Sequence, residues 1–183
     1  MAPYTIADYL LDKSNIQDLV IRVGWCCDRG DWDGLTKLFA DEVVVDYTEM
    51  MGGTPTHHTA AAQSQVWKDM LSGLDSTQHV FTGHLVDLPQ PGNIEKPGEA
   101  SGSCNFLITL RRAAAAAAGG PAVQSGGHYA LKFVRTAVPG DTGNPWRLTH
   151  WKAYLSHMSG NPDVVKGEHT GVSWLDGVKF SKE

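Results

Sequence analysis

The sequence predicts an α+β fold, with helices packed on one face of a largely antiparallel sheet. Apolar residues recur at three- and four-residue spacing through much of the first 72 residues, which is typical of amphipathic helices. Four extended segments rich in β-branched and aromatic residues follow. The chain has 183 residues, 42% of them hydrophobic, which suits one globular domain. We therefore expect a single domain over residues 1–183, with a core at about 10–158 and a polar tail at 159–183.

The helices are predicted from apolar spacing and from their end signals. The first is expected to begin near Ser14 and to end at Gly30, a left-handed stop. Its buried side consists of Ile16, Leu19, Val20, Val23 and Cys27. Asp31 is a candidate N-cap for a short second helix. Thr59 is a candidate N-cap for a third helix, which Gly73 ends.

The strands are predicted from β-branched and aromatic runs. A first strand is expected through about Met50, followed by a loop, "GGTPTHHT". Later strands are expected at 77–88, 101–112, 126–136 and 145–158. An alanine run between the second and third of these later strands ends in Gly-Gly-Pro, so we expect a hairpin tip rather than a helix.

Composition and charge exclude several classes of protein. A net charge of −5 and no basic stripe argue against a nucleic-acid partner. The sequence has no signal-peptide pattern and no apolar run of about 18 residues, so we expect no membrane association. Cys26 and Cys27 are adjacent in an odd set of three cysteines, which suits a reducing cytoplasmic location. The eight histidines lack metal-ligand spacing, and no glycine-rich nucleotide turn is present, so we expect neither metal nor cofactor.

Three stretches of the sequence together carry a family resemblance. They are "CDRGDWDGLTKLFADEVVVDYTEMMGG", "DSTQHVFTG" and "NPWRLTHWKAYLSHMSGNPDV". With the order of elements, they resemble the SnoaL-like branch of the NTF2-like superfamily over about residues 10–165. The resemblance implies a cone, in which a curved, mostly antiparallel sheet and three or four helices enclose an apolar pocket. It also implies a homo-oligomer, dimer or trimer. Family members include polyketide cyclases, scytalone dehydratase, steroid isomerases, epoxide hydrolases and non-catalytic binders.

The similarity to scytalone dehydratase extends to some catalytic positions and not to others. The catalytic aspartate, tyrosine and histidine of that enzyme match Asp28, Tyr47 and His79. A tyrosine of the enzyme falls on Cys27, and its second histidine falls near Leu110. Its serine and asparagine fall near His128 and Ala130. About half of the polar set is therefore replaced, which leaves the reaction open.

Asp28 and His79 form the central functional hypothesis. Asp28 lies at the predicted end of the first helix, where the helix dipole disfavours a carboxylate unless a partner is present. We expect it to accept a hydrogen bond from one imidazole nitrogen of His79, which leaves the other nitrogen facing the pocket as a general acid or base. On its strand His79 is expected to share a face with Phe81 and Leu85. The alternative is a buried pair that only ties helix to sheet.

The other candidate site residues have two readings each. Tyr47 either polarises a substrate carbonyl or is a core tyrosine. His128 is either a second acid–base group or a partly solvated strand residue, and small Ala130 beside it would leave room for ligand. Either Cys104 or Asn105 should point inward, and Asn105 could then orient a ligand. A further set of candidate substrate-binding residues consists of Cys27, Phe81 and Trp151.

These candidates favour a cofactor-independent dehydratase, isomerase or cyclase. All three reactions begin with removal of a proton α to a carbonyl, here by His79 oriented by Asp28, with Tyr47 and His128 assisting. The aromatic residues favour an apolar polyketide- or terpenoid-type small molecule as the substrate. Two alternatives remain at this point, a non-catalytic binding or assembly module and a hydrolase.

Overall fold

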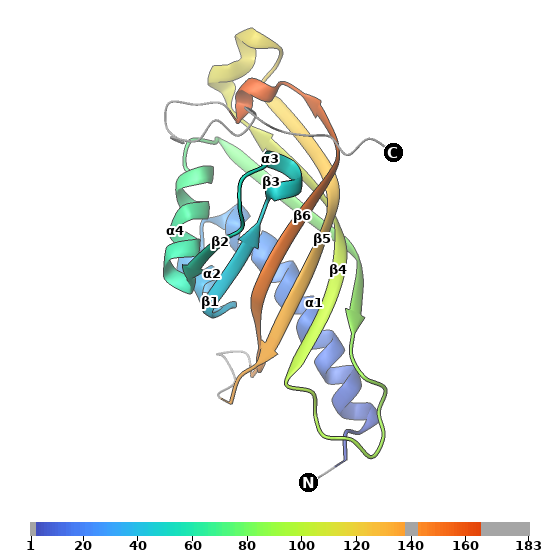
Figure 1. The fold of residues 1–183 in the computed structure, drawn as a ribbon. Coiled ribbons are helices and arrows are strands. Elements are labelled where there is room, and N and C mark those ends of the chain that lie inside the picture. Colours follow the sequence, from blue (N-terminus) through green and yellow to red (C-terminus); the bar gives the residue numbers. More distant parts are fainter. Residues whose placement is uncertain (1–2, 138–142, 166–183) are drawn as a thin grey trace.

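The computed structural model describes residues 3–137 and 143–165, which build one curved six-stranded sheet with helices on its concave side (Figure 1). The helices are α1 (Ile6–Arg29), α2 (Trp32–Thr36), α3 (Thr48–Met51) and α4 (Ala60–Leu71), with 3₁₀ turns η1 (Ala113–Ala118) and η2 (Pro162–Val164). The strands are β1 (Phe39–Asp46), β2 (Thr56–Thr59), β3 (Ser76–Asp87), β4 (Glu99–Arg111), β5 (Ala122–Arg135) and β6 (Trp146–Gly160). Their order is β2-β1-β6-β5-β4-β3, and every pair is antiparallel except β1 with β6. The predicted α+β class is confirmed.

Helix α1 crosses the sheet and extends beyond it at its N-terminal end (Figure 1). It begins at Ile6, where Thr5 and Asp8 form a reciprocal capping box, and not at Ser14 as predicted. The prediction failed because Ile6 and Leu10 are exposed and give the first two turns no buried apolar spacing. The predicted end at Gly30 is correct, with this glycine in the left-handed conformation at φ 67°.

A buried carboxylate fixes α1 to the far end of the sheet. Asp12 accepts hydrogen bonds from the Tyr4 hydroxyl and the Trp146 indole N–H, both at 3.0 Å, and from the Arg135 guanidinium. Buried charges are stable in proteins when they are paired and hydrogen-bonded in this way. Asp12 therefore sets how α1 lies against β5 and β6, and so where its other end meets β3.

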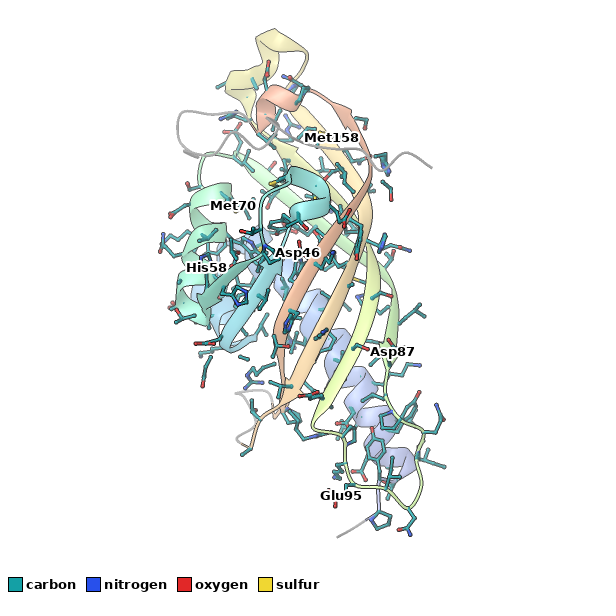
Figure 2. The ribbon with its side chains drawn as sticks, viewed as in Figure 1. Asp46, His58, Met70, Asp87, Glu95 and Met158 are labelled. Carbon is teal, nitrogen blue, oxygen red and sulfur yellow. The ribbon has the colours of Figure 1, made fainter. Side chains whose placement is uncertain are left out.

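Strand β1 ends earlier than predicted because Asp46 turns the chain. Its carboxylate accepts from the backbone N–H of Thr48 at 2.9 Å and from the Thr48 hydroxyl at 2.6 Å, which makes an Asx-turn before α3. Figure 2 labels Asp46. The predicted continuation to Met50 is wrong. The loop predicted at "GGTPTHHT" is also partly wrong, because its second half forms β2 against β1. Thr59 caps α4 as predicted, accepting from the N–H of Ala62.

A bulge in β3 separates the pocket end of this strand from the rest. Gly83 has φ +61°, and the register with β4 shifts between Thr82 and Leu85. His79 lies before the bulge, and Leu85 after it is 67% exposed. The expectation that these two side chains share a face is therefore wrong, since one extra residue reverses the alternation.

The alanine run lies at the tip of the β4–β5 hairpin, as predicted, but forms the 3₁₀ turn η1. Within the described residues, none of the helices is both long and apolar enough to cross a membrane. Of the tail predicted at 159–183, the first two residues belong to β6 and Pro162–Val164 form η2, and residues 166–183 lie outside the described residues.

Candidate active site

A cavity of about 130 Å³, partly open to solvent, lies between α1, α3, α4 and the concave face of the sheet. Figure 2 labels Met70 on α4 and Met158 on β6, two of the side chains in its wall. The wall also contains aliphatic side chains and several aromatic rings, among them Trp67, Phe81, Phe106, Tyr129 and Trp151. Among the described residues no Asp, Glu, Lys or Arg lines the cavity. Such a pocket suits a neutral, apolar small molecule.

The predicted contact between Asp28 and His79 is present. The carboxylate of Asp28 accepts three hydrogen bonds, from the Thr77 hydroxyl at 2.8 Å, the His79 backbone N–H at 2.8 Å and the His79 ring at Nδ1, 2.6 Å away. Burial acts to raise the pKa of Asp28, but the hydrogen bonds from His79 and Thr77 outweigh it and hold the pKa below its ordinary value. The carboxylate is therefore ionised near neutral pH.

This contact fixes how the imidazole of His79 presents itself to the cavity. An ionised carboxylate only accepts hydrogen bonds, so the ring nitrogen facing Asp28, Nδ1, must carry a proton. In the neutral ring, Nε2 is then unprotonated and has a free lone pair. His79 lines the cavity, its side chain is only 12% exposed, and Asp28 lies behind it. The geometry is that of a general base with an orienting carboxylate.

A glycine in α1 allows the helix to come this close to β3. A Cβ on Gly24 would lie 2.9 Å from Cβ of His79 and 2.9 Å from the ring of Phe81. Any larger residue would push the helix or the strand away. Glycine within a helix costs about 1 kcal/mol relative to alanine, so Gly24 was a signal in the sequence that could have been noticed and was not.

Tyr47 follows β1 and lines the cavity. Burial, with a smaller contribution from the nearby Cys27, raises its pKa well above the ordinary value, and the adjacent Trp67 indole lowers it by less. The phenol is therefore neutral. Tyr47 reaches the cavity from the turn into α3 and not from the strand on which it was predicted.

The structure does not place His128, Ala130 or Asn105 in the cavity wall, where they were predicted. His128 is exposed on the outer face of β5 and stacks on Tyr154, with ring centroids 4.6 Å apart. Ala130 and Asn105 lie on the same outer face, and neither lines the cavity. Residues alternate along a strand, so the inward neighbours are Tyr129 and Cys104. The expectation that His128 and Asn105 contact a ligand in the cavity is therefore wrong, because both lie on the outer face of the sheet.

The remaining predicted residues lie in the cavity wall. Cys27, Phe81 and Trp151 all line it. Burial, followed by the charge of Asp28, raises the pKa of the Cys27 thiol to about 12. The thiol is therefore protonated and contributes an uncharged group to the cavity wall. Tyr129 was missed by sequence reasoning, although the alternation of buried residues along β5 places it inward.

No group of three or more His, Cys, Asp or Glu side chains capable of holding a metal ion gathers in the described ranges. The polar atoms of the cavity wall come from aromatic rings, a thiol, a hydroxyl and one imidazole. These groups provide hydrogen bonds and proton transfer.

Comparison with known proteins agrees with this fold. The family model of the SnoaL-like domain matches residues 8–152. This match spans more than half of the chain, so the chain belongs to the SnoaL-like domain family. No curated protein sequence matches the chain.

Several solved structures share the fold. The Kfla4162 protein from Kribbella flavida is 20% identical, with 87% of this chain and 100% of that chain covered and a TM-score of 0.75. A candidate scytalone dehydratase from Novosphingobium aromaticivorans is 13% identical over 82% and 88% of the two chains, with a TM-score of 0.64. The hexachlorocyclohexane dehydrochlorinase LinA-type3 from Novosphingobium barchaimii is 11% identical over 84% and 92%, with a TM-score of 0.65. At these identities the likeness establishes the fold.

Proposed function

We propose that the chain is a cofactor-independent acid–base enzyme of lyase type that acts on an apolar small molecule held in the cavity. His79 is the base, and Asp28 is its positioning residue. The observation that carries the proposal is the 2.6 Å contact between Nδ1 of His79 and the Asp28 carboxylate, with the ring in the wall of an apolar cavity. A buried pair serving only to join helix and sheet would not need an adjoining cavity.

The chemistry begins when Nε2 of His79 takes a proton from a carbon next to a substrate carbonyl. The electron pair of the broken C–H bond forms the new double bond, and the imidazolium is stabilised by the ionised Asp28. In a dehydration, the C–O bond on the next carbon then breaks, and the proton on Nε2 passes to the departing hydroxide to give water. Isomerisation and cyclisation share the first step. A general base of this kind contributes about 10²–10⁴-fold in rate.

The comparisons support an elimination over the other reactions. Two of the similar folds are named for eliminations, one as a dehydratase and one as a dehydrochlorinase. The neutral, apolar cavity supports a polyketide- or terpenoid-type substrate over a phosphate ester or a sugar.

The proposal is tested by exchange of the α-hydrogens of cyclohexanone in D₂O, followed by NMR. This reports proton abstraction without knowledge of the natural substrate. We expect the wild type to accelerate exchange and His79→Gln to lose about 10²–10⁴-fold of that rate. His128→Gln, a histidine change on the outer face, is the matched control and should leave the rate unchanged. Equal rates for wild type and His79→Gln would contradict the proposal and favour a non-catalytic binding module.

A further inference from the structure

Tyr129 is a buried residue whose hydroxyl the proposed chemistry does not yet use. The residue is 5% exposed, lies on β5 and lines the cavity. Its hydroxyl makes no hydrogen bond with any of the residues that the structure describes. Among the described residues the buried polar side-chain atoms without a partner are Trp67 Nε1, His84 Nε2 and Trp151 Nε1, so the Tyr129 oxygen is not sealed in the protein. It is open to a partner that enters the cavity.

The ring of Tyr129 is held rigidly by other aromatic rings. It stacks on Phe106 at a centroid distance of 4.4 Å and packs against Trp151 at 4.2 Å and Phe81 at 5.6 Å. Three ring contacts leave the phenol little freedom to turn toward a protein acceptor. A fixed donor of this kind is preorganised for a ligand atom that arrives in the cavity.

Phe81 contacts both Tyr129 and the proposed base, His79. The same Phe81 ring that contacts Tyr129 also contacts the imidazole of His79, with centroids 6.0 Å apart. Both polar side chains therefore border one aromatic surface, which a flat ligand could cover. A proton acceptor and a hydrogen-bond donor at two edges of one ligand are the groups that enolisation of a ketone requires.

The same corner contains a second donor without a partner. The indole N–H of Trp151 is buried and makes no hydrogen bond within the described part of the chain. Burial also raises the pKa of Tyr129 well above its ordinary value, so its hydroxyl keeps its proton and can donate it. On this side of the cavity the polar groups without a protein partner are therefore mainly hydrogen-bond donors. A ligand that pairs with them must carry an acceptor atom.

The size and charge of the cavity limit what that ligand can be. A cavity of roughly 150 Å³ is known to bind benzene, and this one is about 130 Å³. No charged side chain among the described residues lines it. The space therefore suits one neutral six-membered ring.

We propose that Tyr129 is the hydrogen-bond donor to the carbonyl oxygen of a neutral cyclic ketone, bound in the cavity with its α-carbon toward His79. This inference rests on the proposed function and adds the substrate class to it. Donation to the carbonyl oxygen would stabilise the negative charge that develops there when His79 removes the α-proton. Polarising the substrate carbonyl is the role that the sequence had suggested for Tyr47, which also lines the cavity.

The test compares the binding of two ligands of the same shape, cyclohexanone and methylenecyclohexane, which differ only in C=O against C=CH₂. Dissociation constants are measured by NMR titration for the wild type, Tyr129→Phe and Tyr154→Phe. Tyr154 is the matched control, because it is a strand tyrosine on the outer face. Phenylalanine at position 129 keeps the ring stack and removes only the hydroxyl, and unfolding curves will confirm that the variant is folded.

We expect the ratio of the ketone to the alkene dissociation constant to rise about three- to tenfold in Tyr129→Phe, in line with the loss of one hydrogen bond. The ratio should stay at the wild-type value in Tyr154→Phe. An unchanged ratio in Tyr129→Phe would overturn the inference, and so would a wild type that binds neither ligand. These readouts do not involve turnover, so they are independent of the His79→Gln exchange experiment that decides the proposed function.

Discussion

Asp28 holds His79 at two points, since one carboxylate oxygen accepts from the backbone N–H and the other accepts from ring Nδ1. The first contact fixes the strand against the end of α1, and the second fixes the orientation of the imidazole. A partner that did only one of these would leave the ring free to turn or the strand free to slide. The arrangement also explains why a carboxylate is tolerated at the negative end of a helix dipole.

Replacing Asp28 with Asn should slow proton exchange by about 10²-fold or more. An amide that presents its NH₂ group to the ring would force Nδ1 to accept, and the proton would move to Nε2, where the base is needed. The measurement is the cyclohexanone exchange rate in D₂O for Asp28→Asn against wild type. A rate within twofold of wild type would show that the carboxylate does not orient the base.

The Asp28 carboxylate should also make stability depend on acid pH. Its pKa is held below the ordinary aspartate value in the folded chain, so the folded state binds fewer protons than the unfolded state over this range. Its contribution is present above about pH 4 and is lost as the pH falls through the lower, folded pKa. Urea unfolding at pH 7 and pH 3 should show a stability gap between wild type and Asp28→Asn that narrows at pH 3. A gap of the same size at both pH values would contradict this.

Replacing Gly24 with Ala should destabilise the fold although alanine is the better helix former. The added Cβ would lie 2.9 Å from both His79 and Phe81. We expect a loss of about 1–3 kcal/mol in the free energy of unfolding, as for overpacked cores, with a lower exchange rate because His79 moves. Gly98→Ala is the control, since nothing lies within 4 Å of the position of its Cβ. Greater stability in Gly24→Ala than in wild type would show that the helix has room at this point.

Replacing Asp12 with Ala should cost about 3 kcal/mol or more, because it leaves the Arg135 charge and two buried donors without their acceptor. Asp18→Ala in the same helix removes an exposed pair with Arg22 and should cost under about 1 kcal/mol. Urea unfolding of both variants measures the difference. Equal losses would mean that the buried hydrogen bonds of Asp12 stabilise the fold no more than a surface ion pair does.

The cysteine thiols should resist alkylation in the folded chain. Cys27 and Cys104 are buried, and burial raises the pKa of each to about 12, so very little reactive thiolate exists at pH 8. Iodoacetamide labelling followed by mass spectrometry should modify both residues only after urea is added. Rapid labelling of Cys27 in the native protein would show that its thiol is accessible and ionised, and would contradict this prediction.

The sequence predicted the fold class, the Gly30 and Asp31 helix signals and the Asp28–His79 contact, because each depends on local chemistry or on a motif. It misplaced His128 and Asn105, because the face on which a strand residue lies depends on register, which a single position does not specify. It could not place Leu85, because the bulge at Gly83 reverses the alternation. Tyr129 was overlooked because its unpartnered hydroxyl becomes visible only when the surrounding strands are assembled.

The role of His79 as the base is tested most directly by determining the tautomer of its imidazole. This is measured by ¹⁵N NMR of histidine-labelled protein, and His79→Gln assigns the signal. For the neutral ring we expect a proton on Nδ1 and a free Nε2, with the tautomer altered in Asp28→Asn. A neutral His79 that carries its proton on Nε2 in the wild type would contradict the assignment of this ring as the base facing the cavity.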